Sequence, residues 1–223
     1  MIPSNRPMLQ EGLASGGAMR TTTRMLLDLL RTVLIAVPLA IFIRTSVVEA
    51  YRIPSGSMED TILAGDRLLA SKLVYGSEVP LLGLRMPAVR DPVPGDVVIF
   101  RSPIEEGTNL IKRCIAVEGQ TVAIRDKQVV VDGVPVEPPE TGKVGPLRIG
   151  PEMDDYGPTV VPPGHLFVLG DNRDNSTDSR VWGFVRRDEV LGQALWIYWS
   201  HDPDDEKGFW GRIRWDRIGD RIR

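Results

Sequence analysis

The sequence has little of several residue types that carry chemistry or bind polyanions. A single cysteine, Cys114, means that no disulfide can form within the chain. Only two histidines, His165 and His201, are available as imidazole bases for a catalytic nucleophile. Basic residues are not in excess either, since 27 Lys and Arg face 30 Asp and Glu for a net charge of −3. Without a basic field, we expect no nucleic acid partner.

Long uncharged hydrophobic runs are also scarce. The segment 25–48 is mostly apolar, but only residues 32–43 are free of charged side chains. A helix of 23 residues would still be roughly 34 Å long, enough to cross a bilayer core. We therefore predict a transmembrane anchor at residues 25–48, preceded by a disordered tail at residues 1–24. Arginines on the leading side favour a cytoplasmic N-terminus and an extracytoplasmic remainder of the chain.

Two other interpretations of this apolar segment remain open. It could be a buried core helix, although its place near the N-terminus after a basic tail argues against that. It could also be a signal peptide, because Val48-Glu49-Ala50 resembles a small-residue cleavage site.

After residue 50 the sequence lacks long amphipathic helical patterns and internal repeats. Eighteen prolines and 22 glycines separate short apolar runs, which favours strands and turns. The runs that we expect to be strands are 67–70, 96–100, 110–117, 121–124, 128–131, 165–169 and 194–199. Asp132-Gly133 should form a hairpin turn, and residues 134–163 should form an irregular insert. We predict a mainly β fold, an antiparallel barrel or sandwich, over residues 49–223.

A candidate nucleophile lies just after the apolar segment. Ser57 follows Gly56, which permits a tight turn that exposes the hydroxyl, but a serine needs an adjacent base. His165 lies in a Pro-Gly turn and fits a structural role better. Lys112 lies within the apolar run 110–117, where burial would favour its neutral amine. The alternative is an ordinary strand lysine that points to solvent.

The segment 170–180, GDNRDNSTDSR, places many polar residues directly after a predicted strand. Such a segment could be a solvated loop, or a loop braced by pairs such as Asp178 with Arg180. A calcium-binding loop is excluded by the spacing of the acidic residues. We expect no metal and no cofactor.

With these motifs in place, the chain resembles bacterial type I signal peptidases, the leader peptidases of the S26 family, which are membrane-anchored Ser–Lys endopeptidases. The resemblance covers nearly the whole chain, and its most specific part is the segment 170–180. The matching segments, in order, are the N-terminal anchor, 51–58 (YRIPSGSM), Gly65-Asp66, 94–98 (PGDVV), 111–113 (IKR) and 170–180. The family fold is an antiparallel β domain related to that of the LexA-like self-cleaving repressors.

The resemblance implies a catalytic role for several residues. Ser57 would be the nucleophile and Lys112 its general base, with Ser55 and the backbone N–H of Ser57 forming the oxyanion hole. Ser176 would orient the lysine. The residues expected to brace the site as ion pairs are Asp178 with Arg180 and Asp171 with Arg113.

The resemblance also implies a substrate. Small side chains at the first and third positions before the cut, the A-x-A rule, would enter shallow apolar pockets. The residues expected to line these pockets are Tyr51, Ile53, Met58 and Ile111. The partners would be exported preproteins and the lipid bilayer of the cytoplasmic membrane. The enzyme would be monomeric and near the secretion translocon.

The sequence departs from the family pattern in two places. Asp60 stands where the family often has proline, and residues 116–120 replace a Gly-x-Pro-Gly-Asp pattern. A cap domain, if present, must be reduced to residues 134–163. The C-terminal segment with Phe209, Trp210 and Trp215 could touch the membrane interface or pack on the β domain.

Other functions stay open at this point. A pilus-processing peptidase would share the Ser–Lys pair, and a self-cleaving repressor would need a DNA-binding module in place of the apolar segment. A silent membrane-anchored binding protein would be expected to lack Ser57 or Lys112, and both are present. A mitochondrial inner-membrane relative is a further alternative.

Overall fold

The computed structural model describes most of the chain in two separate units. The described residues are 15–59, 61–76, 78–79, 84–85, 87–139, 144–145, 151–204, 208 and 210–223. One unit contains residues up to Arg44, and the other extends from Thr45 to Arg223. Asp60 and Phe209, singled out above, lie outside the described residues, as do residues 1–14 of the predicted tail.

The first unit contains one long helix, α1, from Ser15 to Ser46. It begins ten residues before the predicted anchor, so residues 15–24 are helical rather than a disordered tail. Residues 15–24 contain no proline, and their Ala, Met and Arg are good helix formers. The described side chains, 24–41, are all exposed. None of the described helices combines the length and hydropathy of a membrane span.

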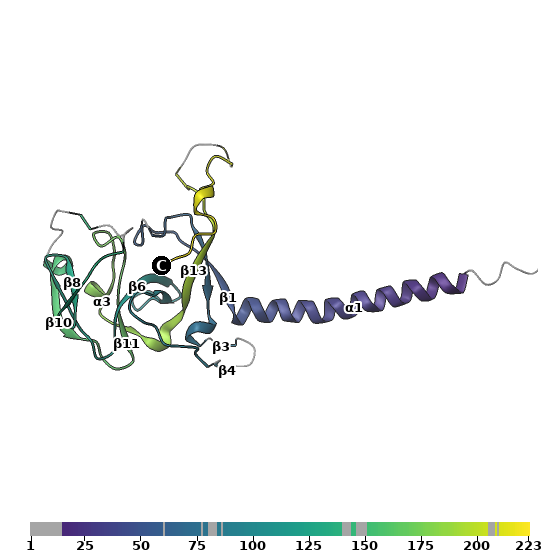
Figure 1. Cartoon of the computed structure of the whole chain (residues 1–223), viewed down its shortest axis with the longest axis horizontal. Coiled ribbons are helices and arrows are strands. Elements are labelled where there is room, and N and C mark those ends of the chain that lie inside the picture. The colour runs from purple at the N-terminus through teal and green to yellow at the C-terminus, as the bar shows by residue number, and fades with distance from the viewer. Residues whose placement is uncertain are drawn as a thin grey trace, which may run out of the picture. The chain divides into compact units, whose positions relative to one another are not determined.

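The second unit is built on a seven-stranded antiparallel sheet (Figure 1). In spatial order its strands are β1 (Val48–Arg52), β2 (Arg67–Ser71), β13 (Val190–Trp199), β5 (Val97–Arg101), β6 (Asn109–Val117), β11 (His165–Leu169) and β12 (Val185–Arg186). β1 was not among the predicted strands, and only its first residue, Val48, lies within the predicted anchor. The sheet is mainly antiparallel β as predicted, and five of the seven predicted runs lie in it.

A second antiparallel sheet has four strands, two of which were predicted. Its order is β10 (Tyr156–Val160), β7 (Thr121–Arg125), β8 (Gln128–Val131) and β9 (Val134–Val136). The predicted irregular insert 134–163 therefore contains two strands and the short helix α2 (Pro151–Asp154), which is a correction. β9 and β10 were not predicted because each contains a proline, Pro135 or Pro158, and proline is unusual inside strands. Both strands lie at an edge of the sheet, where proline is tolerated.

Two tight turns connect the strands of this small sheet. Asp132 and Gly133 both have positive φ, 51° and 82°, as a type I′ hairpin turn requires, which confirms the predicted turn. Asp126 and Lys127, with φ of 48° and 69°, form the matching turn between β7 and β8. That turn contains no glycine, and the sequence analysis did not predict it.

The remaining described elements are short. They are β3 (Glu78–Val79) paired with β4 (Leu84–Arg85), α3 (Ser179–Trp182), and the 3-10 helices η1 (Leu73–Tyr75), η2 (Arg187–Glu189) and η3 (Trp215–Arg217). Three apolar clusters form the core. One joins the ends of β1 and β2 to β13 through residues such as Ile53, Met58 and Ile197. This cluster fixes the segment that follows β1.

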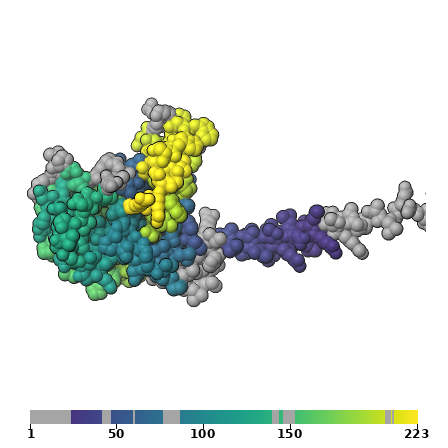
Figure 2. All heavy atoms as spheres, in the orientation of Figure 1, coloured from purple at the N-terminus to yellow at the C-terminus, as the bar shows by residue number. Residues whose placement is uncertain are grey.

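The C-terminal segment folds back on the β unit, as one of the two interpretations predicted. Ile222 N donates to Leu195 O at 2.9 Å, and Ile222 is buried in the same cluster as Ile53. Arg217 donates to the Asp66 carboxylate at 2.8 Å, next to the turn that follows β1. Figure 2 shows the C-terminal segment, in yellow, against the body of the unit. Trp210 and Trp215 stack on each other and stay exposed.

Candidate active site

Ser57 lies in a turn that leaves the edge strand β1. The backbone closes around it, with Glu59 N donating to Gly56 O at 3.0 Å and Ile62 N donating to Met58 O at 2.8 Å. Ile53 and Met58 on either side are buried in the core, whereas Ser57 itself is only partly buried. The apolar anchors therefore hold the turn in place and leave the hydroxyl accessible.

Lys112 approaches Ser57 from the middle of β6. Its Nζ donates to Ser57 Oγ at 2.6 Å, and only 3% of the residue is exposed. Burial lowers the pKa of Lys112 to about 8, against the carboxylates of Asp178 and Asp171, which raise it. A lysine with that pKa is neutral in about a tenth of molecules at pH 7. The predicted pair is thus brought together, and the lysine is buried as predicted.

The two histidines have other neighbours. His165 Nδ1 lies 2.8 Å from Pro163 O, and His201 Nδ1 lies 2.9 Å from Gly65 O. Neither forms a hydrogen bond with Ser57. Lys112 is therefore the base that the geometry offers to Ser57.

The polar segment 170–180 is bonded to the serine turn. Asn172 N donates to Ser57 O at 3.1 Å, and its side-chain amide donates to Gly56 O at 3.2 Å. A Cβ on Gly170 would lie 2.5 Å from Ser57 O and 2.2 Å from Ser176 Oγ, so only glycine fits. The sequence analysis assigned no role to Gly170 or Asn172, although both lie in the segment that it considered most specific.

Both predicted ion pairs are formed and buried. Arg113 donates to the two oxygens of Asp171 at 2.8 and 2.6 Å, and Arg180 donates to those of Asp178 at 2.8 and 2.9 Å. Asp178 also accepts from Gly170 N at 3.0 Å. Such bidentate pairs fix a loop geometrically, because either partner alone would be a buried uncompensated charge.

Two other serines were predicted to take part in catalysis, Ser176 by orienting Lys112 and Ser55 in the oxyanion hole. Ser176 is buried, and its Oγ has no hydrogen-bond partner, so the orienting bond to Lys112 is absent from this structure. Ser55 is exposed beside the turn. The backbone N–H of Ser57 donates to no acceptor within the described part of the chain.

The predicted pocket residues gather in one apolar cluster. Ile53, Met58 and Ile111 are buried in it, and Tyr51 packs against it with its hydroxyl donating to Glu49 at 2.7 Å. Met58 is fully buried, and its sulfur accepts from Asp171 N at 3.4 Å. Met58 therefore has no side-chain surface open to a substrate in this structure. Instead, it links the turn that carries Ser57 to the segment 170–180.

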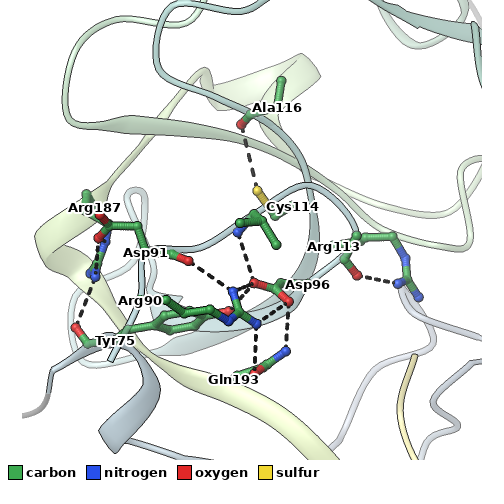
Figure 3. Close-up of polar contacts among 11 residues, drawn as sticks. Tyr75, Arg90, Asp91, Asp96, Arg113, Cys114, Ala116, Arg187 and Gln193 are labelled. Carbon is green, nitrogen blue, oxygen red and sulfur yellow. Dashed lines mark hydrogen bonds and ion pairs between the residues drawn. The ribbon is translucent and has the colours of Figure 1, made fainter. Parts of the chain in front are cut away.

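Two buried aspartates, Asp66 and Asp96, stand at the ends of turns that have the same geometry. Asp66 and Asp96 each follow a glycine of positive φ, and each accepts from the backbone N–H three residues earlier, at 2.9 and 3.0 Å. Figure 3 shows Tyr75, Arg90 and Gln193 converging on the Asp96 carboxylate. The sequence analysis noted both Gly-Asp pairs only as motifs, and their role is to terminate turns.

Comparison with known proteins gives a consistent result. The family described as "Signal peptidase, peptidase S26" matches residues 26–199. "Signal peptidase I" of Pseudomonas fluorescens is 35% identical over 205 residues, covering 74% of this chain and 72% of that protein. "Probable signal peptidase I-2" of Synechocystis is 38% identical over 179 residues, covering 78% and 73%.

Among solved structures, a signal peptidase I from Enterococcus faecalis is 32% identical, with a TM-score of 0.41, and the match covers 48% of this chain and 98% of that one. The family match covers well over half of the chain. The chain therefore belongs to the signal peptidase family, peptidase S26.

Proposed function

We propose that this protein cleaves N-terminal signal peptides from exported preproteins, after small residues of the A-x-A type. Ser57 is the nucleophile and Lys112 the general base. The observation that carries the proposal is the 2.6 Å hydrogen bond from a buried lysine to a serine in a member of the S26 family.

The reaction proceeds in two steps. Neutral Lys112 accepts the hydroxyl proton as Ser57 Oγ attacks the carbonyl carbon. It then donates that proton to the departing amine, which leaves an ester on Ser57. Water gives a proton to Lys112 as its oxygen attacks the ester carbon. The bond to Ser57 Oγ then breaks, Lys112 returns the proton to Oγ, and the signal peptide leaves with a free carboxylate. A pKa of about 8 suits both transfers at neutral pH.

Two donors stabilise the developing oxyanion. The backbone N–H of Ser57 and the exposed hydroxyl of Ser55 flank the nucleophile, and neither has an acceptor among the described residues. Preorganised donors of this kind typically contribute about 10²–10³ in rate each. When Lys112 becomes charged, the unpaired hydroxyl of Ser176 rotates to accept from it. The ion pairs Arg113–Asp171 and Asp178–Arg180 keep the loop rigid during these changes.

The substrate binds as an extended strand. β1 is the last strand of its sheet, so one edge is free to add main-chain hydrogen bonds to a peptide. Tyr51 on β1, with Ile53, Met58 and Ile111, supplies the apolar surroundings that select small side chains. Met58 is fully buried in the free enzyme, so its contribution requires the turn to move when substrate binds.

Residues 25–48 anchor the enzyme in the cytoplasmic membrane, with the N-terminus cytoplasmic and the β unit outside. The proposal is supported by the exposed large apolar side chains of α1, such as Leu26, Leu34 and Ile35. Anchoring confines the enzyme and its tethered substrate to one surface and raises their effective concentration. The enzyme acts as a monomer near the translocon.

The test is cleavage of a preprotein with an Ala-x-Ala junction by the full chain in detergent. Ser57→Ala and Lys112→Ala should abolish cleavage, whereas the matched control His165→Ala should cleave normally. A second substrate with large residues at the two specificity positions should resist the wild type. Activity of Lys112→Ala, or cleavage that ignores the junction sequence, would refute the proposal.

A further inference from the structure

Arg173 is a buried cation that has no partner among the residues described by the structure. Only 4% of the residue is exposed, and its Nε has no hydrogen-bond partner. Within the described part of the chain its guanidinium forms no hydrogen bond and no ion pair. The neighbouring Arg113 and Arg180 each hold a carboxylate with two bonds. A buried charge left in this state is costly, because the protein has removed its water without replacing it.

The charges around Arg173 do not neutralise it. Burial lowers its pKa, Asp171 and Asp178 raise it, and Arg180 and Arg113 lower it. Those four neighbours are already joined as two ion pairs. Among the described residues, these two pairs leave the charge of Arg173 without a carboxylate of its own.

A cavity of about 510 Å³ lies beside this charge. Arg113 and Arg173 line it, and Val131, Val136 and Pro139 supply apolar walls. A cavity of this size and mixed lining is typical of small-molecule sites. Arg113, Cys114 and Ile115 of β6 all line it, and neither Lys112 nor Ser57 is among its lining residues.

Two carboxylates also line the cavity. Asp132 is engaged in the hairpin turn, where it accepts from Thr121 N at 2.7 Å and from the Gln120 amide at 3.0 Å. Glu137 is exposed and forms no ion pair with Arg173. The cation therefore remains open to an external anion, with Glu137 as the internal competitor.

We propose that this cavity binds a short organic carboxylate. Arg173 holds the carboxylate group, and the apolar chain lies along Val131, Val136 and Pro139. Arg173 follows Asn172, which is bonded to the Ser57 turn, so an occupant also stabilises the loop behind the proposed nucleophile.

The probes are sodium hexanoate and its uncharged counterpart hexanamide. They are added to the full chain in detergent, and binding is followed by NMR through the Arg173 Nε–H signal, identified by its loss in Arg173→Gln. The backbone amide signals of Gly95 and Val136 report binding in that variant. Arg67→Gln, which removes an exposed arginine on β2, is the matched control. None of these signals depends on peptidase activity.

Hexanoate should shift the signals saturably and hexanamide should not. Arg173→Gln should weaken hexanoate binding by at least about tenfold, since a charge-assisted hydrogen bond is lost. Arg67→Gln should bind like the wild type, and Glu137→Gln should bind more tightly. A second arm compares acetyl-Ala-Val-Ala with its C-terminal amide. Tighter binding of the free peptide acid than of hexanoate would assign the natural carboxylate to a peptide C-terminus, and the reverse to an aliphatic acid.

Three results would overturn the proposal. One is equal binding of hexanamide and hexanoate to the wild type, a comparison that needs no variant to fold. Another is unchanged hexanoate binding by folded Arg173→Gln. The third is binding of hexanoate only by Glu137→Gln, which would make Glu137 the counter-ion of Arg173.

Discussion

Two neighbouring cations on β6, Lys112 and Arg113, have different partners and different roles. Lys112 and Arg113 are adjacent and almost equally buried, at 3% and 6% exposure. Lys112 meets a neutral hydroxyl at 2.6 Å, and burial lowers its pKa to about 8. Arg113 meets a carboxylate, Asp171, which it holds with two bonds. Equal burial therefore produces a base on one face and a permanent brace on the other.

Desolvation acts on both Lys112 and Arg113, so the hydrogen-bond partner of each residue decides whether it stays charged. A carboxylate replaces the lost hydration of a cation and keeps it charged, whereas a hydroxyl does so only in part. The residue type also matters, since an arginine stays protonated at any relevant pH, and a lysine can become neutral. Four predictions test this comparison, in order of decreasing effect.

Lys112→Arg should have the largest effect of the four changes. It keeps the positive charge and the donor but removes the neutral base, so cleavage should fall by about 10²–10⁴. The reciprocal change, Arg113→Lys, should retain most of the activity. Rates on an Ala-x-Ala preprotein provide the measurement. Near-normal activity of Lys112→Arg would mean that Lys112 serves only as a charge.

Asp171→Asn should destabilise the β unit by about 3–5 kcal/mol, because it leaves Arg113 buried without its carboxylate. Urea unfolding of the full chain in detergent measures the loss. The matched control is Asp188→Asn, which breaks an exposed ion pair with Arg186 and should leave the free energy of unfolding nearly unchanged. Equal losses for the two variants would show that burial does not govern the Asp171 pair.

The stability of the wild type relative to Lys112→Met should rise with pH. The folded-state pKa of Lys112, about 8, is below its unfolded value of about 10.4. Between these values the unfolded chain binds the extra proton, so unfolding becomes harder as pH increases, by about 3 kcal/mol in total. Below pH 8 both states are protonated and the full burial cost remains.

This pH dependence must be read as a difference between two proteins. Burial also raises the pKa of Cys114, to about 12, which destabilises both proteins at high pH. Denaturant unfolding at pH 7, 8, 9 and 10 supplies the two profiles. Parallel profiles would mean that folding does not lower the pKa of Lys112.

Ser176→Ala should have the smallest effect on stability. Its buried hydroxyl has no partner, so its removal should change the free energy of unfolding by less than about 1 kcal/mol. Ser200→Ala is the contrast, since Ser200 Oγ donates to the Asp66 carboxylate at 2.6 Å and its loss should cost about 1.5–3 kcal/mol. A moderate loss of cleavage with unchanged stability would assign Ser176 to lysine orientation. A large loss of stability would reveal a partner for Ser176 that this structure lacks.

The strands were predictable because their signal is local. Alternating or continuous apolar runs between turn residues identified β2, β5, β6 and β11, and the positive φ of Asp132-Gly133 followed from residue type. β1 was missed because its short sequence adjoins the apolar segment, and β9 and β10 because they contain proline.

The residue types of the candidate site were also fixed by sequence. Ser57, Lys112 and the charged segment 170–180 could be selected before any contact was known. What the sequence could not supply is distance and burial, which depend on strand order. β11 pairs with β6 and leads into the segment 170–180, whose Asn172 N donates to Ser57 O. Lys112 of β6, 55 positions from Ser57 in the sequence, thus comes to lie beside it.

Only the tertiary structure distinguished three buried cations of one sequence type. Arg113 and Arg180 each found a carboxylate, whereas Arg173 did not. In the sequence Arg173 and Arg180 both stand among aspartates, whereas Arg113 has none nearby. Pairing and desolvation are set by atoms brought together from β6, the small sheet and the polar loop, and no local pattern encodes that.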